Sequence, residues 1–183
     1  MAEQQMKKRD LRAFYEVKAP LTSTKIQLYG QSPEALAGKV VSLDLTRSMR
    51  GKNVALNLRT RLDNGQLVGD PLSLEVFGSY IRRMIRNGTD YVEDSFVVKC
   101  KDCELIVKPF LITRKKVSRT LQHALRTATK EHLTATFLVK PALEIFTDVM
   151  AQKTQKELSL KLKKLYPLAL CEIRILKVVE GKK

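Results

Sequence analysis

The sequence lacks several features that would point to a particular class of protein. It has no tryptophan, only two histidines and three cysteines, and its aromatic fraction is 6%. No stretch approaches the roughly 18 consecutive apolar residues that a membrane-spanning helix needs. Residues 1–10 are polar and contain no apolar region of the kind found in secretory signals. We therefore expect a cytoplasmic protein with reduced cysteines and no membrane partner.

Signature motifs of catalysis are also missing. The chain has no GxxxxGK[ST] or GxGxxG phosphate loop, and no HExxH or GxSxG motif. His123 and His132 are nine residues apart, so they do not form the i,i+4 pair typical of metal ligands. Asp44, Asp63 and Glu75 have no histidine beside them, which favours solvated acids over catalytic ones. We expect no enzymatic activity and no cofactor.

One short motif resembles a ligand site. Cys100 and Cys103 form a CxxC pair, which supplies two of the four ligands that a structural zinc site needs. Cys171 and a histidine could complete the site only if the fold brought them together. We favour two small apolar residues that flank a hairpin turn. The expectation is therefore no metal, with zinc at Cys100 and Cys103 as the alternative.

Positive charge is abundant and is arranged in blocks. The chain has 34 Lys+Arg against 19 Asp+Glu, a formal net charge of +15. Residues 45–62, 80–86 and 105–130 contain no acid at all. An ordinary solvated helix mixes both signs to gain ion pairs, whereas a single-sign block needs an external counter-charge. Phosphate groups supply that charge, so composition favours a nucleic-acid partner.

Hydrophobic periodicity predicts an α+β fold. Apolar and polar residues that alternate with a period of two predict strands, including a last strand from Cys171 onward. Apolar residues at helical spacing predict helices. Asn64-Gly65 favours a hairpin turn. The expected strands cover 41–45, 54–62, 72–76, 91–100, 103–112 and 171–175. The expected helices are 80–86, one from 114 onward, one starting at Pro141 with Leu143, Phe146 and Met150 buried, and one ending before Tyr166 with Leu158, Leu162 and Leu165 buried.

The predicted architecture is a barrel-like antiparallel or mixed sheet flanked by about four helices, with the last strand closing the sheet. Residues 22–34 are expected to form a loop. We divide the chain into a flexible basic arm at 1–13, a single domain at 14–179 and a short tail at 180–183. On a helix from Arg114 onward, Lys115, Arg119, Arg126 and Lys130 would form one basic stripe.

Several stretches also fall in an order that resembles a known family. They are Tyr15-Glu16-Val17-Lys18-Ala19-Pro20, Gly38-Lys39-Val40-Val41, Leu43-Asp44-Leu45, Ser79-Tyr80-Ile81-Arg82-Arg83-Met84-Ile85-Arg86, Lys101-Asp102 before Leu105, the basic stretch 114–130, Leu165-Tyr166-Pro167-Leu168 and Ile173-Arg174. Together they resemble the archaeal and eukaryotic small-subunit ribosomal proteins called S-three-A, or eS-one. The resemblance extends from about Phe14 to Val178.

The resemblance implies a structural protein on the platform of the small ribosomal subunit, near the messenger exit. The implied partners are small-subunit ribosomal RNA and neighbouring platform proteins, with initiation factors as further candidates. Two departures stand out. Cys103 occupies a position where the family's hairpin has glycine, and the long terminal extensions of eukaryotic members are nearly absent. A compact member of the family is therefore expected.

Charge and resemblance together predict the RNA-binding residues. The candidates are Lys7, Lys8, Arg9, Arg12, Lys18, Arg47, Arg50, Lys52, Arg82, Arg83, Arg86, Arg114, Lys115, Lys116, Arg119, Arg126, Lys130 and Arg174. Arginines are the better candidates for ordered phosphate contacts because the guanidinium can donate two parallel hydrogen bonds. Two other functions stay open: an RNA-processing or RNA-modifying enzyme with an unrecognised site, and an adaptor at anionic membrane surfaces.

Overall fold

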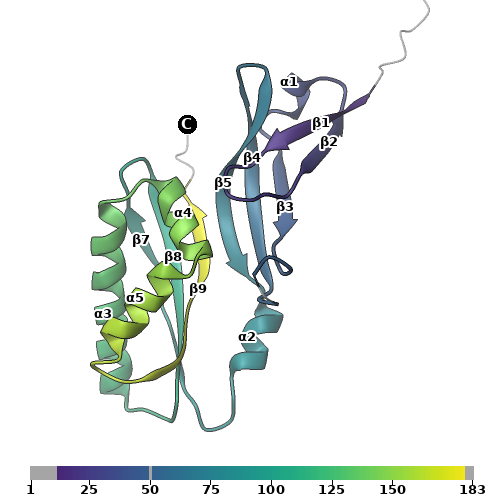
Figure 1. The fold of residues 1–183 in the computed structure, drawn as a ribbon. Coiled ribbons are helices and arrows are strands. Elements are labelled where there is room, and N and C mark those ends of the chain that lie inside the picture. The colour runs from purple at the N-terminus through teal and green to yellow at the C-terminus, as the bar shows by residue number, and fades with distance from the viewer. Residues whose placement is uncertain (1–11, 50, 180–183) are drawn as a thin grey trace, which may run out of the picture. The chain divides into compact units, whose positions relative to one another are not determined.

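The computed structural model describes residues 12–49 and 51–179. Nine strands and five helices lie in this part of the chain (Figure 1). The strands are β1 Ala13–Lys18, β2 Ile26–Gly30, β3 Val40–Asp44, β4 Val54–Asp63, β5 Gln66–Val76, β6 Tyr91–Glu93, β7 Phe96–Lys99, β8 Glu104–Thr113 and β9 Leu168–Val178. The helices are α1 Pro33–Leu36, α2 Gly78–Met84, α3 Arg119–Leu138, α4 Ala142–Met150 and α5 Lys153–Leu162.

Hydrogen bonds join the strands into a mixed sheet. Its main path runs β2-β1-β5-β9-β8-β6, β3 and β5 both pair with β4, and β7 pairs with β8. β1 and β5 are parallel, whereas β9 is antiparallel to both β5 and β8. The α+β class and the mixed sheet are confirmed. In the part of the chain that the structure describes, the sheet is not closed, because β9 lies inside it rather than joining its two ends.

The chain divides into two compact units. Unit 1 contains residues 12–41 and 58–70, and unit 2 contains 42–57 and 71–179. In unit 1, Val17, Ile26, Leu36, Leu58 and Leu67 are buried. The Thr60 hydroxyl donates to the Leu36 carbonyl at 2.5 Å and so attaches α1 to β4. These side chains make a small core of their own between β1, β2, α1 and the tip of the β4–β5 hairpin.

Unit 2 has the larger core. Leu105, Val107 and Leu111 of β8 are at most 1% exposed. α3 and α5 supply further fully buried side chains, and α5 packs on β9. These side chains are Leu125, Leu133, Phe137, Leu158 and Leu162. One face of the β7–β8–β9 sheet is thus covered by helices.

Several local expectations hold. Asn64 and Gly65 have positive φ, at 46° and 79°, as the predicted hairpin turn requires. Pro141 caps α4 and precedes its first helical residue. The prediction of a loop over 22–34 is wrong, because β2 and α1 lie there. Ser32 caps α1 by accepting from the Ala35 N–H, a start signal that the polar sequence around it concealed.

Other local expectations need correction. The predicted strand over 91–100 is split into β6 and β7, which pair with different parts of β8. Leu143 and Leu165 were expected to be buried, yet they are 45% and 49% exposed. Leu165 lies beyond the end of α5, so helical spacing no longer places it on the buried side. No helix within residues 12–49 and 51–179 has the length and hydropathy needed to cross a bilayer.

Candidate nucleic-acid interface

Strand register brings three connections of unit 2 to one end of the sheet. Tyr91 at the start of β6 pairs with Ile112 near the end of β8, and Thr113 at the end of β8 pairs with Leu168 at the start of β9. The α2–β6 connection, the β8–α3 connection and the α5–β9 connection therefore meet there. Figure 1 shows these connections at the lower end of the helical layer.

Acid-free runs of the sequence coincide with these three connections or directly flank them. Residues 77–89, 113–119 and 161–167 contain no Asp or Glu. The cations that they expose form a surface that we call the basic end. Its members are Arg86, Arg114, Lys115, Lys116, Arg119, Lys163 and Lys164, all exposed. Fixed like charges so close together repel one another, so this surface is suited to an anionic partner.

A polar anchor at Asp90 and Thr113 holds the first two connections together. The Thr113 side chain is 0% exposed, its hydroxyl donates to the Asp90 carbonyl at 2.9 Å, and the Asp90 N–H donates back to that hydroxyl at 3.0 Å. The Asp90 carboxylate accepts from the Val117 backbone at 2.9 Å and from the Gln122 amide at 3.4 Å. Asp90 therefore positions the basic loop instead of neutralising it.

The same anchor explains where α3 begins. The expected start at Arg114 is wrong, because residues 114–117 form a loop and Ser118 caps the helix by accepting from the Leu121 N–H. Lys115 consequently leaves the predicted helical stripe and joins the loop. Arg119, Arg126 and Lys130 stay on exposed positions of α3, so a shorter stripe continues from the basic end along the helix.

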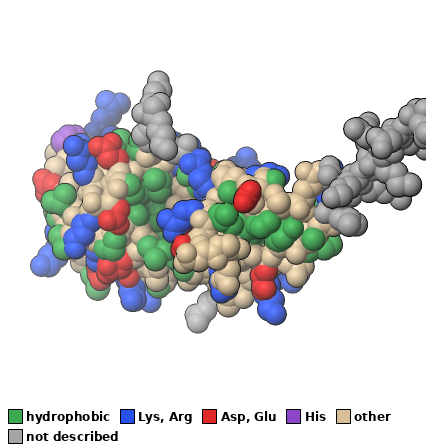
Figure 2. Space-filling model, turned by 90° about the horizontal axis from the view of Figure 1, so that it is seen from above, with side chains coloured by type: hydrophobic (Ala, Val, Ile, Leu, Met, Phe, Trp, Pro, Cys, Tyr) green, Lys and Arg blue, Asp and Glu red, His purple; other side chains and the backbone are tan. Residues whose placement is uncertain are grey.

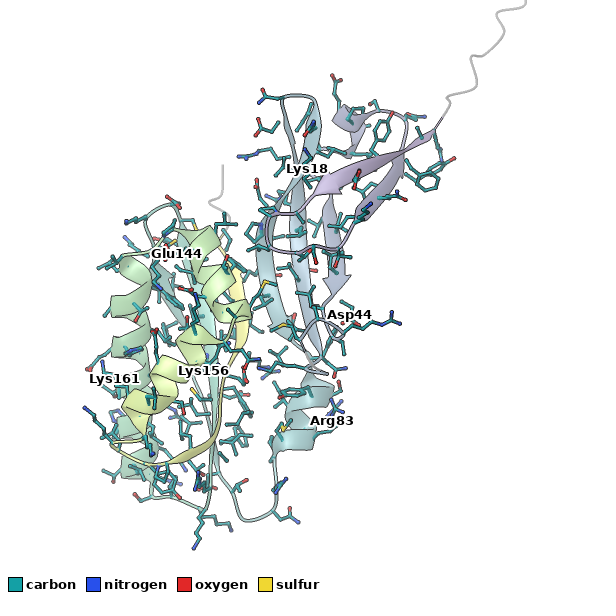
Figure 3. All side chains as sticks on the ribbon, in the orientation of Figure 1. Lys18, Asp44, Arg83, Glu144, Lys156 and Lys161 are labelled. Atoms are coloured by element: carbon teal, nitrogen blue, oxygen red, sulfur yellow. The ribbon has the colours of Figure 1, made fainter. Side chains whose placement is uncertain are left out.

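α2 presents a second arginine cluster in unit 2. Arg82 and Arg83 are exposed in its last turn and line a shallow pocket with Asn53 and Ser79. The Arg83 guanidinium donates to Asn53 Oδ1 at 2.9 Å and lies 5.7 Å from the centre of the Tyr80 ring. Figure 3 marks Arg83 on this short helix. Two guanidiniums, a hydroxyl and an amide are a set of donors that suits a phosphate group.

Positive charge is not uniform over unit 2. In Figure 2, acidic and basic side chains alternate on the upper face of the helical unit. Ion pairs within unit 2 include Lys140 with Asp148 and Lys153 with Asp148 at 3.7 Å. Hydrogen bonding to Asp148 raises the pKa of Lys140. The mixed face thus provides its own counter-charges, in contrast to the basic end.

Two of the predicted RNA-binding residues are engaged inside unit 2. Lys52 is 8% exposed, and its ammonium group lies 2.5 Å from the carboxylate of Glu172 in β9. Arg174 is half-buried and donates to Glu93 at 2.9 Å. Both cations already have carboxylate partners, which makes them weaker candidates for phosphate contacts.

The remaining predicted residues lie elsewhere. Arg12 and Lys18 are exposed in unit 1, where Lys18 donates to the Gln66 amide oxygen at 2.6 Å (Figure 3). Arg47 is exposed in unit 2. The other four, namely Lys7, Lys8, Arg9 and Arg50, lie outside the described residues.

The structure adds two candidates to those predicted from the sequence. Lys163 and Lys164 follow α5, and the sequence alone favoured diffuse point charges for them over ordered phosphate contacts. They join the basic end only because Leu168 pairs with Thr113. The acid-free run 161–167 before the last predicted strand was the available signal, but it did not reveal which strand β9 would pair with.

Two of the acids, Asp44 and Asp70, have local partners in the part of the chain that the structure describes. No group of three His, Cys, Asp or Glu side chains there could hold a metal ion. The Asp44 carboxylate accepts from the Thr46 hydroxyl and its N–H, and these bonds lower the pKa of Asp44. Asp70 lies 3.4 Å from the Arg61 guanidinium. Asp44 and Asp70 are thus each engaged with a neighbouring side chain.

Comparison with known proteins gives a consistent family. The Ribosomal S3Ae family matches residues 3–182. A protein of Nanoarchaeum equitans named small ribosomal subunit protein eS1 is 24% identical over 163 residues, which are 84% of this chain and 82% of the relative. A protein of the same name from Methanobrevibacter smithii is 26% identical over 171 residues, or 88% of each chain.

A third relative carries the same name. The eS1 protein of Methanothermobacter thermautotrophicus is 33% identical over 107 residues, which are 58% of this chain and 55% of the relative. The resemblance that rested on short ordered stretches is thereby confirmed. Because the family match extends over nearly the whole sequence, this chain belongs to the Ribosomal S3Ae family.

Proposed function

We propose that the protein is a structural constituent of the small ribosomal subunit and binds small-subunit ribosomal RNA through the basic end of unit 2. The proposal rests on one observation above all. Three connections distant in sequence present exposed cations at one end of the β6–β8–β9 sheet, and the single acid among them, Asp90, holds the loop that carries them. Family membership supports the ribosomal setting.

The mechanism is electrostatic docking on a prearranged scaffold. Arg and Lys neutralise phosphates and release counterions, while the buried core fixes the spacing of the cations. The exposed arginines of α2 and the basic stripe on α3 supply further cations for contacts with phosphates. We place the protein at the platform near the messenger exit, with neighbouring platform proteins and initiation factors as partners, on the strength of the family. In this proposal residues 14–179 act together as one ribosomal-protein domain.

Salt dependence tests the binding mode. If about 6–10 phosphates are contacted, affinity for structured ribosomal RNA should fall roughly 10³–10⁵-fold between about 50 and 200 mM salt, by analogy with duplex DNA. Cells expressing the tagged full chain should show it sedimenting with small subunits after a high-salt wash. Salt-insensitive RNA binding, or a chain that stays at the top of the gradient, would contradict the proposal.

A further inference from the structure

The CxxC segment forms the tip of a hairpin in unit 2. Lys99 of β7 pairs with Glu104 of β8, so Cys100 and Cys103 face each other across the two-residue loop 101–102. The Cys100 N–H donates to the Cys103 carbonyl at 2.9 Å. In such a hydrogen-bonded antiparallel pair the Cα atoms are about 5.5 Å apart. That separation falls within the range of about 4.4–6.8 Å that a disulfide spans.

The two sulfur atoms lie together inside this turn. Their separation is 3.3 Å, and the Cys100 thiol also donates to the Cys103 carbonyl at 2.7 Å. Both cysteines are free and partly exposed. The thiols are therefore next to each other and within reach of small oxidants, and forming a bond between them requires only a small movement of each side chain.

Two sulfurs suffice for a disulfide but not for zinc. A tetrahedral structural zinc site needs four ligands, and among the described residues no third His, Cys, Asp or Glu completes a site with this pair. We propose that Cys100 and Cys103 form a reversible oxidative modification site, which closes to an intramolecular disulfide on exposure to a hydroperoxide. This inference is independent of the proposed ribosomal function.

The reaction balances in two steps. The Cys100 thiol loses its proton, and the thiolate attacks the peroxide and gives a sulfenic acid and a hydroxide that this proton converts to water. The Cys103 thiol then attacks the sulfenic sulfur and forms the S–S bond, and its proton leaves with the sulfenic hydroxyl group as a second water. Both thiols are oxidised and the peroxide is reduced, and a thiol reductant reverses the change.

The two cysteines have different roles. Burial, together with a smaller effect of the neighbouring Cys100, raises the pKa of Cys103 to about 12. A thiol that keeps its proton is a poor first nucleophile, so Cys103 acts second, on the sulfenic acid beside it. Burial also raises the pKa of Cys171 to about 12. Cys171 lies on β9, where it pairs with Leu111 of β8, away from the hairpin. It provides an internal control.

The modification site lies at the opposite end of β8 from the basic end. β8 runs ten residues from Glu104 to Thr113, and Cys103 directly precedes it. At about 3.3 Å per residue, the two sites are roughly 30 Å apart. Oxidation of the hairpin and binding of RNA at the basic end can therefore be measured separately.

Peptide mass spectrometry of the intact chain tests the proposal. The reduced full chain is treated with hydrogen peroxide at stoichiometric excess, free thiols are alkylated, and the peptides are mapped. We expect the peptide that spans 100–103 to lose the mass of two hydrogen atoms as the disulfide forms. This loss should be more than about tenfold faster than the oxidation of Cys171. Dithiothreitol should restore both thiols. Equal oxidation of all three cysteines, or dimers linked by disulfides, would overturn the proposal.

Serine variants test the assigned roles. In Cys103→Ser, dimedone should trap a sulfenic acid at Cys100, whereas Cys100→Ser should leave Cys103 largely unreactive. The Cys171→Ser chain should oxidise like the original, and far-UV circular dichroism checks that each variant is folded. Stoichiometric zinc binding that blocks oxidation of the pair would instead assign the hairpin to a metal and overturn the redox proposal.

Discussion

The Asp90 carboxylate accepts a hydrogen bond from the backbone N–H of Val117 at 2.9 Å, across 27 residues of sequence. An acid thus holds the loop whose cations are proposed to bind RNA. We predict that Asp90→Ala weakens RNA binding although it makes the chain more positive. Losing this acceptor costs about 1–3 kcal/mol and frees the loop. By net charge alone, the same change would strengthen binding.

Asp102→Ala is the matched control for that experiment. It removes an equal charge from an exposed turn at the other end of β8, and it should leave affinity unchanged or slightly raised. Fluorescence anisotropy with a labelled fragment of small-subunit ribosomal RNA would measure both variants. Tighter binding by Asp90→Ala would mean that charge alone governs the interaction.

The position of charge, and not its total, should determine the salt dependence. Replacing Arg114, Lys115 and Lys116 by glutamine should reduce the slope of log affinity against log salt by roughly one for each phosphate that the protein no longer neutralises. The control replaces three exposed lysines at the far end of the same sheet, Lys99, Lys101 and Lys177. The two triple variants have equal net charge, so equal slopes would contradict a localised interface.

The buried ion pair between Lys52 and Glu172 should matter for stability. Lys52→Met leaves a carboxylate uncompensated at a site that is 9% exposed, and should cost about 3–5 kcal/mol of unfolding free energy. Replacing both residues by methionine removes the stranded charge and should recover most of that loss. Urea denaturation of the two variants measures the difference. A double variant as unstable as Lys52→Met would argue against this cause.

Stability should decline at acidic pH because of His132. Burial lowers its pKa below the ordinary 6.5, and the nearby Lys161 lowers it further. The unfolded chain then binds a proton that the folded chain does not. The free energy of unfolding should therefore fall as pH decreases through about 6.5. His132→Gln should flatten this part of the curve, whereas exposed His123→Gln should not. Equal slopes for both variants would contradict the assignment.

Much of the fold could be predicted from local pattern. Alternation with a period of two indicated β4 and the second half of β5, and the turn at Asn64-Gly65 followed from the residues that tolerate positive φ. Pro141 correctly indicated where α4 begins. The patterns failed where a short element was embedded in polar sequence, as for β2, and where a tertiary contact set a boundary, as for the start of α3 at Arg119.

The candidate interface was predictable in composition but not in arrangement. Charge blocks identified Arg86, Arg114 and Arg119, which lie on the basic end. The same criterion included Lys52, which is engaged with Glu172, and it left out Lys163 and Lys164. Charge counting cannot distinguish these cases, because the partner of each cation comes from a strand far away in the sequence.

The sequence by itself determined the α+β class, the surplus of positive charge and the membership of a ribosomal family, since each depends on residue identity and local spacing. Only the tertiary structure decided which cations stand together. Alternation shows that a segment is a strand but not which strand it pairs with, because hydrogen-bonded partners lie far apart in the chain. The pairing of Thr113 with Leu168, and the bond from Val117 to Asp90, turned scattered charges into one surface.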